Sequence, residues 1–595
     1  MARIPVALAP VVPVERPDLE FTASSARELG SGLTVALVGF QDQDNLGLRY
    51  LKSAAEHHGH RCNIVTYDAN EETVSQQILQ LQCDVVGLSL IFQYMAPQFS
   101  KLVAALRRGG FEGHITIGGH YPSFDPENVL QRIPGLDSVV RFEGEATFVE
   151  LLAHLEHGQD WKPIVGLALV DQSGEVRMNP LRPSIEDLDI LPFPDRAEVS
   201  YEGQDLPTAS ILASRGCPWN CSFCSIRPFY EAPGGALRRL RRPEQVVREM
   251  VELHRTRGVV AFLFQDDDFM ATGPRGRAWA LELADALGAS EIAGRVSLKI
   301  SCRSDEVDLE VFRRLRDMGG LTHVYLGVES GDPETLKHLR KQLKPDAHLR
   351  AADVFRTLDL SFDFGYMVLE PYSTFAAVRS GVDFLDRFVG DGWSVATFCR
   401  TLPYAGTPLE VQLRSEGRLL GTPFEPDYEF LDPRLDVFYD WLLYTFRRRN
   451  FSDEGLCHVL RALQFELHLR VNGRRPATAV ERATARHLTR MTNRIATSTL
   501  RGALEHCEST TIEALRDDPS YLLALAEFEQ SEEARIEVEV MSFYESFRSS
   551  IGQGFDQHHG VDRHHGVGQH PRIDLPGTSG MDSLPGGFSR TWTVA

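Results

Sequence analysis

The chain has 595 residues, of which 43% are hydrophobic and 24% charged, and its formal net charge is −21 at pH 7. This length allows roughly three or four domains, and the negative charge argues against nucleic acid or an anionic membrane surface as the main partner. No apolar run reaches the roughly 18 residues of a membrane span, and proline interrupts the apolar start, so neither a membrane segment nor a signal peptide is expected.

Short apolar segments alternate with amphipathic ones from residue 33 to residue 160. The expected strands are 33–40, 62–68, 84–91, 114–119 and 138–145. The expected helices are 45–59, 71–82, 96–110 and 146–158. This alternation predicts a doubly wound parallel α/β sheet, and such sheets bind ligands at the carboxyl ends of their strands. Residues 1–32 form an extension before this domain, and residues 161–205, rich in proline and acid, are predicted to be an inter-domain connection.

A second alternating series occupies residues 206–409. Its expected strands are 209–216, 259–265, 295–303, 323–330, 361–369 and 393–400, with helices such as 243–258 and 374–388 between them. Six βα units predict a partial (β/α)6 barrel, in which chemistry occurs at the carboxyl ends of the strands. Residues 410–547 have apolar residues at helical spacing and are predicted to be mainly helical. Residues 548–595, rich in Gly, His and Pro, are predicted to be disordered.

Three of the nine cysteines, Cys217, Cys221 and Cys224, follow the first strand of the second series as C-x3-C-x2-C. The other six are scattered singly, which is not a disulfide framework, so a reducing cytoplasm is expected. Three thiolates can hold three irons of a [4Fe–4S] cluster and leave the fourth iron open to a ligand. A zinc site is an alternative, but no fourth Cys or His follows within the next dozen residues. A redox-active thiol pair is a further alternative.

This cysteine spacing, with Phe223 before the last cysteine, resembles the radical S-adenosylmethionine (SAM) superfamily. The segments "FLFQDDDF" and "YLGVESGDPETLKHLRK" resemble later strand ends of its cobalamin-associated branch, and "DVVGLSL", "GGHYPSFDPENVL" and "RFEGEAT" resemble that branch's cobalamin-binding domain. The resemblance covers roughly residues 33–420. It implies a Rossmann-like cobalamin-binding domain before a partial radical SAM barrel. It also implies a [4Fe–4S] cluster, SAM and cobalamin (methylcobalamin) as cofactors, and an external electron donor such as flavodoxin or ferredoxin.

The resemblance also implies roles for residues of the barrel. Cys217, Cys221 and Cys224 would bind the cluster. The residues expected near SAM are Phe223, Asp266, Asp267, Arg303 and Glu329. Each has a structural alternative: Phe223 could simply pack in the core, and Glu329 could cap the next helix. Arg303 suits the SAM carboxylate but could equally pair with Asp305, and the acidic run that ends with Asp268 could supply a helix cap.

For cobalamin, the candidates lie at strand ends of the first sheet. They are Asn45, Ser89, Gly118, Gly119 and His120. Gly118 and Gly119 would allow a close approach of the backbone, although a glycine pair is also typical of an ordinary tight turn. The loop from Gly39 to Gly47 occupies the place of the D-x-H-x-x-G loop of other cobalamin domains, but it contains no histidine. A protein imidazole on cobalt is therefore not expected, and His120 is interpreted as a residue of the binding loop.

The resemblance implies a cobalamin-dependent radical SAM methyltransferase that transfers a methyl group to an unactivated carbon of a small biosynthetic intermediate. Cyclisation or ring contraction with the same cofactors is the enzymatic alternative, and a non-catalytic cobalamin-binding sensor is the other. The catalytic residues remain unidentified at this point. In the C-terminal tail, His558, His559, His564 and His565 could bind a divalent metal, but an accidental histidine-rich end is favoured.

Overall fold

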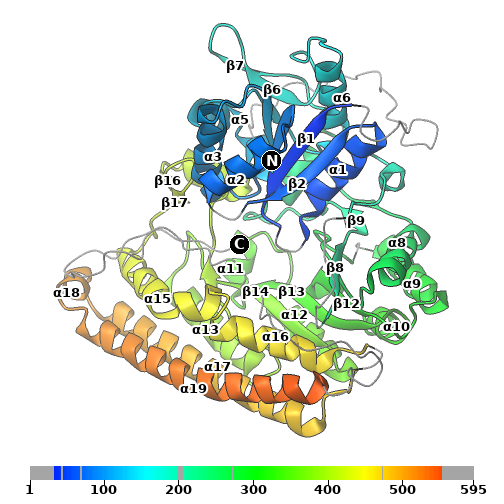
Figure 1. Cartoon of the computed structure of the whole chain (residues 1–595). Helices are drawn as coiled ribbons and strands as arrows, with labels where there is room; N and C mark the ends of the chain where they lie inside the picture. The colour runs from blue at the N-terminus through cyan, green and yellow to red at the C-terminus, as the bar shows by residue number, and fades with distance from the viewer. Residues whose placement is uncertain are drawn as a thin grey trace.

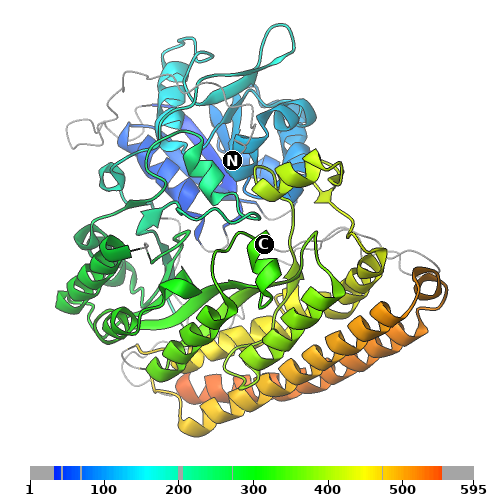
Figure 2. The same ribbon diagram turned by 180° about the vertical axis from the view of Figure 1, so that it is seen from behind.

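The computed structural model describes residues 32–41, 44–67, 70–197, 206–270, 273–471 and 474–552. An N-terminal α/β region lies above a second sheet, and two long helices run along the base of the molecule (Figures 1 and 2). None of the described helices combines the length and the apolar composition needed to cross a membrane. Most of the predicted N-terminal extension and of the C-terminal tail, including its four candidate metal-binding histidines, lies outside the described residues.

The first sheet has the strand order β2-β1-β3-β4-β5-β6-β7. Its parallel strands are β1 (Thr34–Gly39), β2 (Arg61–Thr66), β3 (Val85–Ser89), β4 (His114–Gly118) and β5 (Ser138–Val140). Helices α1 (Leu46–His57) and α6 (Glu145–Glu156) pack on one face. Helices α2 (Glu71–Gln80), α3 (Ala96–Arg108) and α5 (Pro126–Arg132) pack on the other. The predicted doubly wound architecture is confirmed, since apolar strands are covered on both faces.

The sequence interpretation differs from the structure at the end of this domain. The stretch predicted as a connection from residue 161 contains β6 (Leu167–Val170) and β7 (Val176–Met178), which extend the sheet in antiparallel fashion. Its proline and acid content obscured the short apolar run of β6, whose first three residues are buried. The strand predicted to continue to residue 145 ends at Val140, because Phe142 adopts a positive φ of 62° and turns the chain towards α6.

The second sheet contains six parallel strands in the order β15-β14-β13-β12-β11-β8. They are β8 (Thr208–Ile211), β11 (Ala261–Phe264), β12 (Ser297–Arg303), β13 (Leu321–Glu329), β14 (Ser361–Leu369) and β15 (Cys399–Arg400). The intervening helices are α8 (Pro243–Arg257), α9 (Gly273–Ala289), α10 (Leu309–Gly319), α11 (Pro333–His338), α12 (Pro345–Leu358) and α13 (Phe375–Val389). The predicted open barrel of six units is confirmed, although its last strand is only two residues long.

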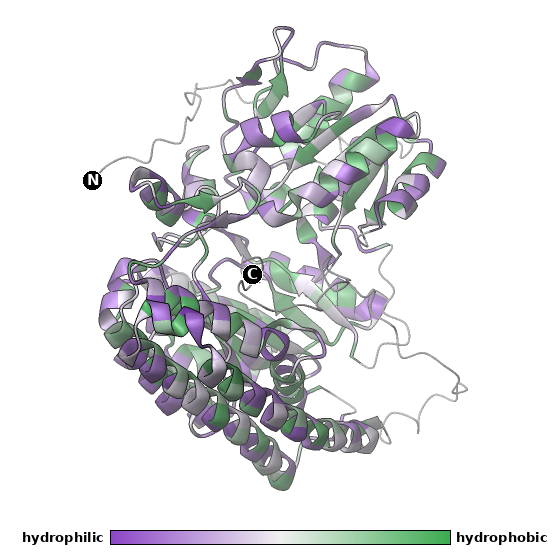
Figure 3. Cartoon of the chain, turned by 90° about the vertical axis from the view of Figure 1, so that its left-hand side faces the viewer, coloured by the Kyte–Doolittle hydropathy of each residue, from purple (hydrophilic) through white to green (hydrophobic). Residues whose placement is uncertain are grey.

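The C-terminal region is mainly helical, as predicted. It comprises α14 (Pro408–Ser415), a small hairpin of β16 (Leu420–Gly421) and β17 (Pro426–Asp427), α15 (Pro433–Phe451), α16 (Leu456–His468), α17 (Ala479–Ser509), α18 (Ile512–Asp517) and α19 (Ser520–Gly552). Polar and apolar residues alternate along the long helices (Figure 3). Buried residues of α15 and α17, such as Trp441 and Leu500, belong to the same apolar core as the barrel strands. These helices are therefore part of the barrel's own core.

Candidate active site

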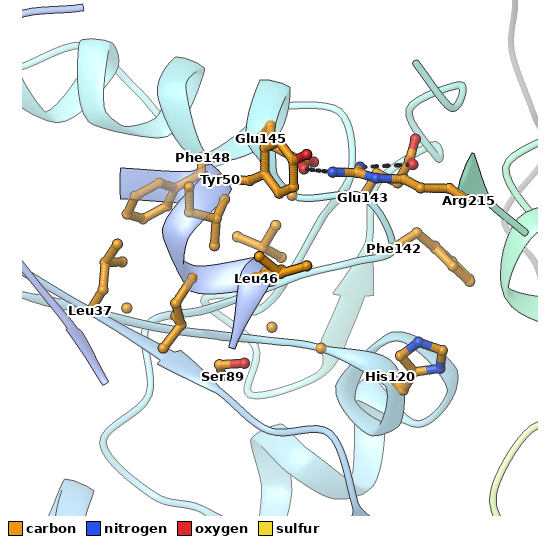
Figure 4. A pocket seen from close by; sticks show the side chains of 18 of the residues that line it. Leu37, Leu46, Tyr50, Ser89, His120, Phe142, Glu143, Glu145, Phe148 and Arg215 are labelled. Atoms are coloured by element: carbon orange, nitrogen blue, oxygen red, sulfur yellow. Dashed lines mark hydrogen bonds and ion pairs between the residues drawn. The ribbon is translucent and has the colours of Figure 1, made fainter. Parts of the chain in front are cut away.

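A cavity lies between the two sheets (Figure 4). From the first domain it is lined by residues that include Leu37, Ser89, Gly118, Gly119, His120, Phe142 and Glu143. From the barrel it is lined by Leu212, Arg215, Phe229, Tyr230, Gln265 and Asp267. Four of the five residues predicted to bind cobalamin are thus brought together on one side of a space whose other side belongs to the barrel.

Bare backbone forms part of this cavity wall at the end of β4. Gly119 has a φ of +113°, and a Cβ atom there would lie 2.2 Å from the carbonyl oxygen of Leu90. At Gly118 a Cβ atom would lie 3.1 Å from the carbonyl oxygen of Val140. Only glycine fits at residue 119, because both the dihedral angle and the close approach exclude a side chain. The wall is consequently left open for a ligand with a large flat surface.

His120 joins the first domain to the barrel. Its ring stacks on Phe229 of α7 (Ile226–Glu231), with centroids 4.2 Å apart and an interplanar angle of 16°. Burial lowers the pKa of His120 to about 4, so the imidazole is neutral at pH 7. The histidine expected in a binding loop therefore lies in the cavity wall against the neighbouring domain (Figure 4).

Asn45 is placed differently from the other predicted cobalamin residues. Its side-chain oxygen accepts a hydrogen bond from the Leu48 amide at 3.4 Å, and its Nδ2 donates to the Phe40 carbonyl at 2.7 Å. Asn45 therefore caps α1, and it is not among the residues that line the cavity. The adjacent Asp44 accepts hydrogen bonds from Arg196 at 3.0 Å and from the Ser210 amide at 2.8 Å, which ties this loop to β8.

A buried ionic clamp connects the two domains beside the cavity. Arg215 contacts Glu143 at 3.0 Å and Glu145 at 2.6 Å (Figure 4). Arg239 contacts Glu143 at 2.8 Å. Burial alone would raise the pKa of Glu143, but the two arginines hold it below its ordinary value. This clamp was missed from the sequence, because its members are about seventy residues or more apart. Locally, the sequence pointed to these residues only through the segment "RFEGEAT", which contains Glu143 and Glu145.

The three cysteines lie in the loop between β9 (Ser214–Arg215) and α7, and all three thiols are free. The loop begins at Gly216, which has a φ of +89°, and whose amide donates to Asp267 at 2.8 Å. Burial raises the pKa of Cys224 to about 12 and raises that of Cys217 still further, with the nearby Asp268 adding to the effect on Cys217. Such thiols ionise only when a positively charged partner binds them.

The three aspartates after β11 hold this loop. Asp266 accepts hydrogen bonds from the Ser214 hydroxyl and from the Ala213 amide, and Asp267 accepts the Gly216 amide. Burial raises the pKa of both carboxyl groups to about 6. Asp266 and Asp267 were predicted to contact SAM; in the structure their carboxylates accept these hydrogen bonds, and a contact with SAM stays a prediction. Asp268 comes nearest to a thiol, since its Oδ2 lies 4.0 Å from the Cys217 Sγ.

Arg303 adopts the structural pairing that was left open. Its guanidinium donates to both oxygens of Asp305 at 3.0 and 3.1 Å and lies 3.8 Å from the ring centroid of Trp219. Its Nη1 also lies 3.9 Å from the Cys221 Sγ. The cation thus remains beside the cysteine loop, even though its fork is occupied by Asp305. Phe223 is half-buried in the same loop.

Glu329 ends β13 with a positive φ of 64° and pairs with Lys341 at 2.9 Å. It does not cap the next helix, because Asp332 accepts the Thr335 amide and fills that role for α11. A strained, half-buried carboxylate at a strand end is typical of a ligand-binding position. Lys341 and Trp219 were not identified from the sequence, although "YLGVESGDPETLKHLRK" ends at Lys341. Among the described residues, no three His, Cys, Asp or Glu side chains converge on a single-ion site, so the cluster ligands stay a prediction.

Comparison with known proteins identifies both halves of the site. The B12 binding domain family matches residues 32–152, and the radical SAM superfamily matches residues 211–378. An uncharacterized methyltransferase of Pyrococcus horikoshii is 27% identical over 432 residues, which cover 71% of this chain and 88% of that protein. The anaerobic magnesium-protoporphyrin IX monomethyl ester cyclase of Synechocystis sp. is 32% identical over 250 residues, which cover 41% of this chain and only 47% of the relative.

Among solved structures, the cobalamin-dependent SAM radical enzyme OxsB with aqua-cobalamin and SAM bound has a TM-score of 0.66 to this chain. The match covers 88% of this chain and 85% of OxsB, at 16% sequence identity, and therefore indicates a shared fold. The B12-binding match coincides with the first sheet, and the radical SAM match begins at Ile211, just before the cysteine loop. The chain therefore combines a B12 binding domain with a radical SAM domain that follows it.

Proposed function

We propose that this chain is a methyltransferase that moves a methyl group from SAM, by way of cobalamin, to an unactivated carbon of a small biosynthetic intermediate. The observation that carries the proposal is the shared cavity, whose wall includes Gly119 of the first domain and Asp267 of the barrel. Asp267 in turn holds the first residue of the cysteine loop through the Gly216 amide. A substrate carbon in this region could meet both cofactors in a site shielded from bulk water.

The residues of the cysteine loop fit a [4Fe–4S] cluster. Buried thiols with raised pKa values need a positively charged partner to exist as thiolates, and Cys217, Cys221 and Cys224 would find it in the irons. When bound, a three-cysteine cluster supplies an open iron for SAM and the electron that starts radical chemistry. Arg303, 3.9 Å from the Cys221 Sγ, favours the thiolate form of this ligand. Asp266 and Asp267 keep the loop in place.

The residues at the end of β3 and β4 fit a large, flat cofactor. Ser89, Gly118, Gly119 and His120 would hold cobalamin, and the bare backbone at residue 119 would allow its close approach. When bound, cobalamin supplies a carrier for the methyl group. Asp44 and Asn45 are engaged in hydrogen bonds to the protein itself. Neutral His120 stacks on Phe229 and helps to seal the cavity against water.

Rearrangement without methyl transfer is the second candidate, because the Synechocystis relative carries the name of a cyclase. The Pyrococcus relative, which aligns over much more of both chains, carries the name of a methyltransferase and supports our proposal. A sensor without turnover is a third possibility that the same experiment addresses. Both enzymatic candidates require a small-molecule substrate and an external electron donor.

Mass spectrometry of products formed from methyl-labelled SAM distinguishes the three. The full chain, reconstituted anaerobically with iron, sulfide and cobalamin, is incubated with a reductant, labelled SAM and candidate substrates. We expect 5′-deoxyadenosine together with a product that carries the labelled methyl group. A product without the label, formed with 5′-deoxyadenosine, would indicate rearrangement instead. Complete absence of SAM cleavage would support the sensor.

A further inference from the structure

A cluster of charged side chains lies at the amino ends of the barrel strands, opposite the cysteine loop. Lys299, His323 and Asp363 come from the beginnings of β12, β13 and β14, and Arg461 comes from α16. The His323 Nε2 lies 3.3 Å from the Asp363 Oδ2, and the Arg461 Nε lies 3.9 Å from the Asp363 Oδ1. Nothing in the proposed mechanism uses these four groups.

The two cations of this cluster are poorly satisfied. The Arg461 Nε is buried and has no hydrogen-bond partner among the described residues. Within the same residues, the ion pair with Asp363 is the only polar contact of the Arg461 guanidinium, and Lys299 makes neither a hydrogen bond nor an ion pair. Buried polar groups in proteins are nearly always hydrogen-bonded, so this exception requires an explanation.

The charges of the cluster do not balance. Lys299 and Arg461 are opposed by the single carboxylate of Asp363, which already faces His323. Burial lowers the pKa of His323, so the imidazole is neutral at pH 7. One positive charge is thus left over inside a chain whose net charge is −21. A bound anion would neutralise it.

Two side chains at and near the cluster are partly exposed. Tyr325 lies on β13, between two neighbouring strands, yet it is 38% exposed. Its hydroxyl lies over Gly365, where a Cβ atom would be only 2.8 Å from it and 3.2 Å from the Glu329 carboxylate. The Arg461 side chain is 29% exposed. The side chains of Tyr325 and Arg461 are therefore both partly open to solvent.

From these contacts we infer that Lys299 and Arg461 bind an anionic group of the substrate, a carboxylate or a phosphate. This inference rests on the proposed function, because it concerns the substrate of the same reaction. Lys299 and Arg303 share one face of β12 and are four residues apart, which corresponds to about 13 Å of strand. The substrate therefore carries its anion about 13 Å from the carbon that reacts near the cysteine loop. Arginine suits this task, since its planar fork matches both kinds of anion.

A purely structural role for Arg461, which would attach α16 to the sheet, does not explain the unsatisfied donor and the unbalanced charge of the cluster. Helix α16 is already held by an apolar face that includes Leu460, Leu463 and Leu467, all fully buried. It lies against β13 and β14 (Figure 1). A structural tie would also be expected to show the hydrogen bond that Arg461 and Asp363 lack at 3.9 Å.

Calorimetric titration of the reconstituted full chain with inorganic phosphate and, separately, with succinate tests the inference. We expect saturable binding of at least one of the two anions, weakened about tenfold or more by Arg461→Met and by Lys299→Met. Arg461→Lys is expected to retain part of the binding. The matched control is Arg255→Met on the outer helix α8, where the arginine is exposed; it should bind like the wild type. The preferred anion distinguishes a phosphate from a carboxylate.

Two results would overturn the inference: no saturable binding to the wild type, or equal binding to the wild type and both methionine variants. Cobalamin and iron content show whether each variant has folded. If Arg461→Met does not fold, the anion binding of Lys299→Met tests the inference instead. Formation of 5′-deoxyadenosine by the wild type without substrate reports separately on the proposed function, and the Arg255→Met control should keep this activity. A wild type that binds the anion through Arg461 but never cleaves SAM would contradict the proposed function and leave the anion site standing.

Discussion

The first sheet and the barrel sheet present opposite surfaces at equivalent places, the carboxyl ends of their parallel strands. In the first sheet, Gly118 and Gly119 leave backbone bare, and the nearest histidine is neutral. In the barrel, the strand ends carry acids and bases, including Asp268, Arg303 and Glu329. A bare wall suits a large cofactor that binds by surface contact, whereas paired charges suit a cluster and a small zwitterion. The same strand-end rule therefore serves two kinds of ligand.

The largest effect is expected from a variant that removes the cluster ligands of the barrel and leaves the first sheet unchanged. Replacing Cys217, Cys221 and Cys224 together with alanine should reduce the iron content of the reconstituted chain from about four per chain to near zero. Formation of 5′-deoxyadenosine should cease, while cobalamin content should remain, because no cysteine lines the cobalamin side of the cavity. Cys83→Ala, a half-buried cysteine of the first domain, is the control and should keep all of its iron. A triple variant that retains full iron and sulfide would contradict the cluster assignment.

The next largest effect is expected from a variant that weakens the ionic clamp between the first domain and the barrel. Arg215→Met leaves Glu145 buried without its arginine and leaves Glu143 with Arg239 alone, and it should cost about 3–5 kcal/mol in free energy of unfolding. Denaturant unfolding of the cofactor-free chain measures it. The exposed Arg535→Met, which breaks pairs with Glu532 and Glu539, is the control and should cost about 0–1 kcal/mol. Equal costs for the two variants would mean that the clamp does not hold the domains.

The clamp also predicts a pH dependence. The pKa of Glu143 is held below its ordinary value of 4.5 in the folded chain, so its contribution to stability is present above pH 4.5 and is lost as the pH falls through the folded pKa. The wild type should therefore lose stability more steeply than Arg215→Met below pH 4.5. Unfolding titrations at a series of pH values compare the two slopes, and parallel slopes would count against a charged Glu143.

A substitution at Gly119 affects only the bare backbone at the strand ends of the first sheet. Gly119→Ala places a Cβ atom 2.2 Å from the Leu90 carbonyl and should cost about 1–3 kcal/mol, together with most of the bound cobalamin. Gly110→Ala is a matched control, because Gly110 also has a positive φ, of 87°, but a Cβ atom there meets nothing within 4 Å. Absorbance of bound cobalamin and unfolding curves measure both effects. Full cobalamin content in Gly119→Ala would remove residue 119 from the binding site.

The smallest effect concerns Asn45. Asn45→Ala should cost about 0.5–2 kcal/mol through loss of the α1 cap, but it should leave the amount of bound cobalamin unchanged. Asn45→Ser, which keeps a capping oxygen, should recover part of the stability. If Asn45→Ala instead lost cobalamin at unchanged stability, Asn45 would have the binding role that the sequence first indicated.

Local patterns predicted most of the fold and part of the site. Alternating apolar segments were sufficient for both parallel sheets, and the three cysteines Cys217, Cys221 and Cys224 lie, as expected, in the loop after the first barrel strands. The pattern failed at β6 and β7, where a short apolar run lies within polar surroundings. It also gave no sign of the hydrogen bonds that Asp266 and Asp267 accept, because their partners lie about fifty residues earlier in the chain. Pairings across such separations are set by the packing of whole elements, which no local window contains.

The central claim is that one cavity brings both cofactors together, and electron paramagnetic resonance of the reconstituted chain tests it most directly. The sample contains cob(II)alamin and the reduced [4Fe–4S] cluster, each of which carries an unpaired electron. We expect the two signals to broaden or split through their mutual magnetic interaction, and each to become simple when the other cofactor is omitted or when the cysteines are replaced. Two unperturbed signals, adding up to the spectra of the separate cofactors, would contradict a shared cavity.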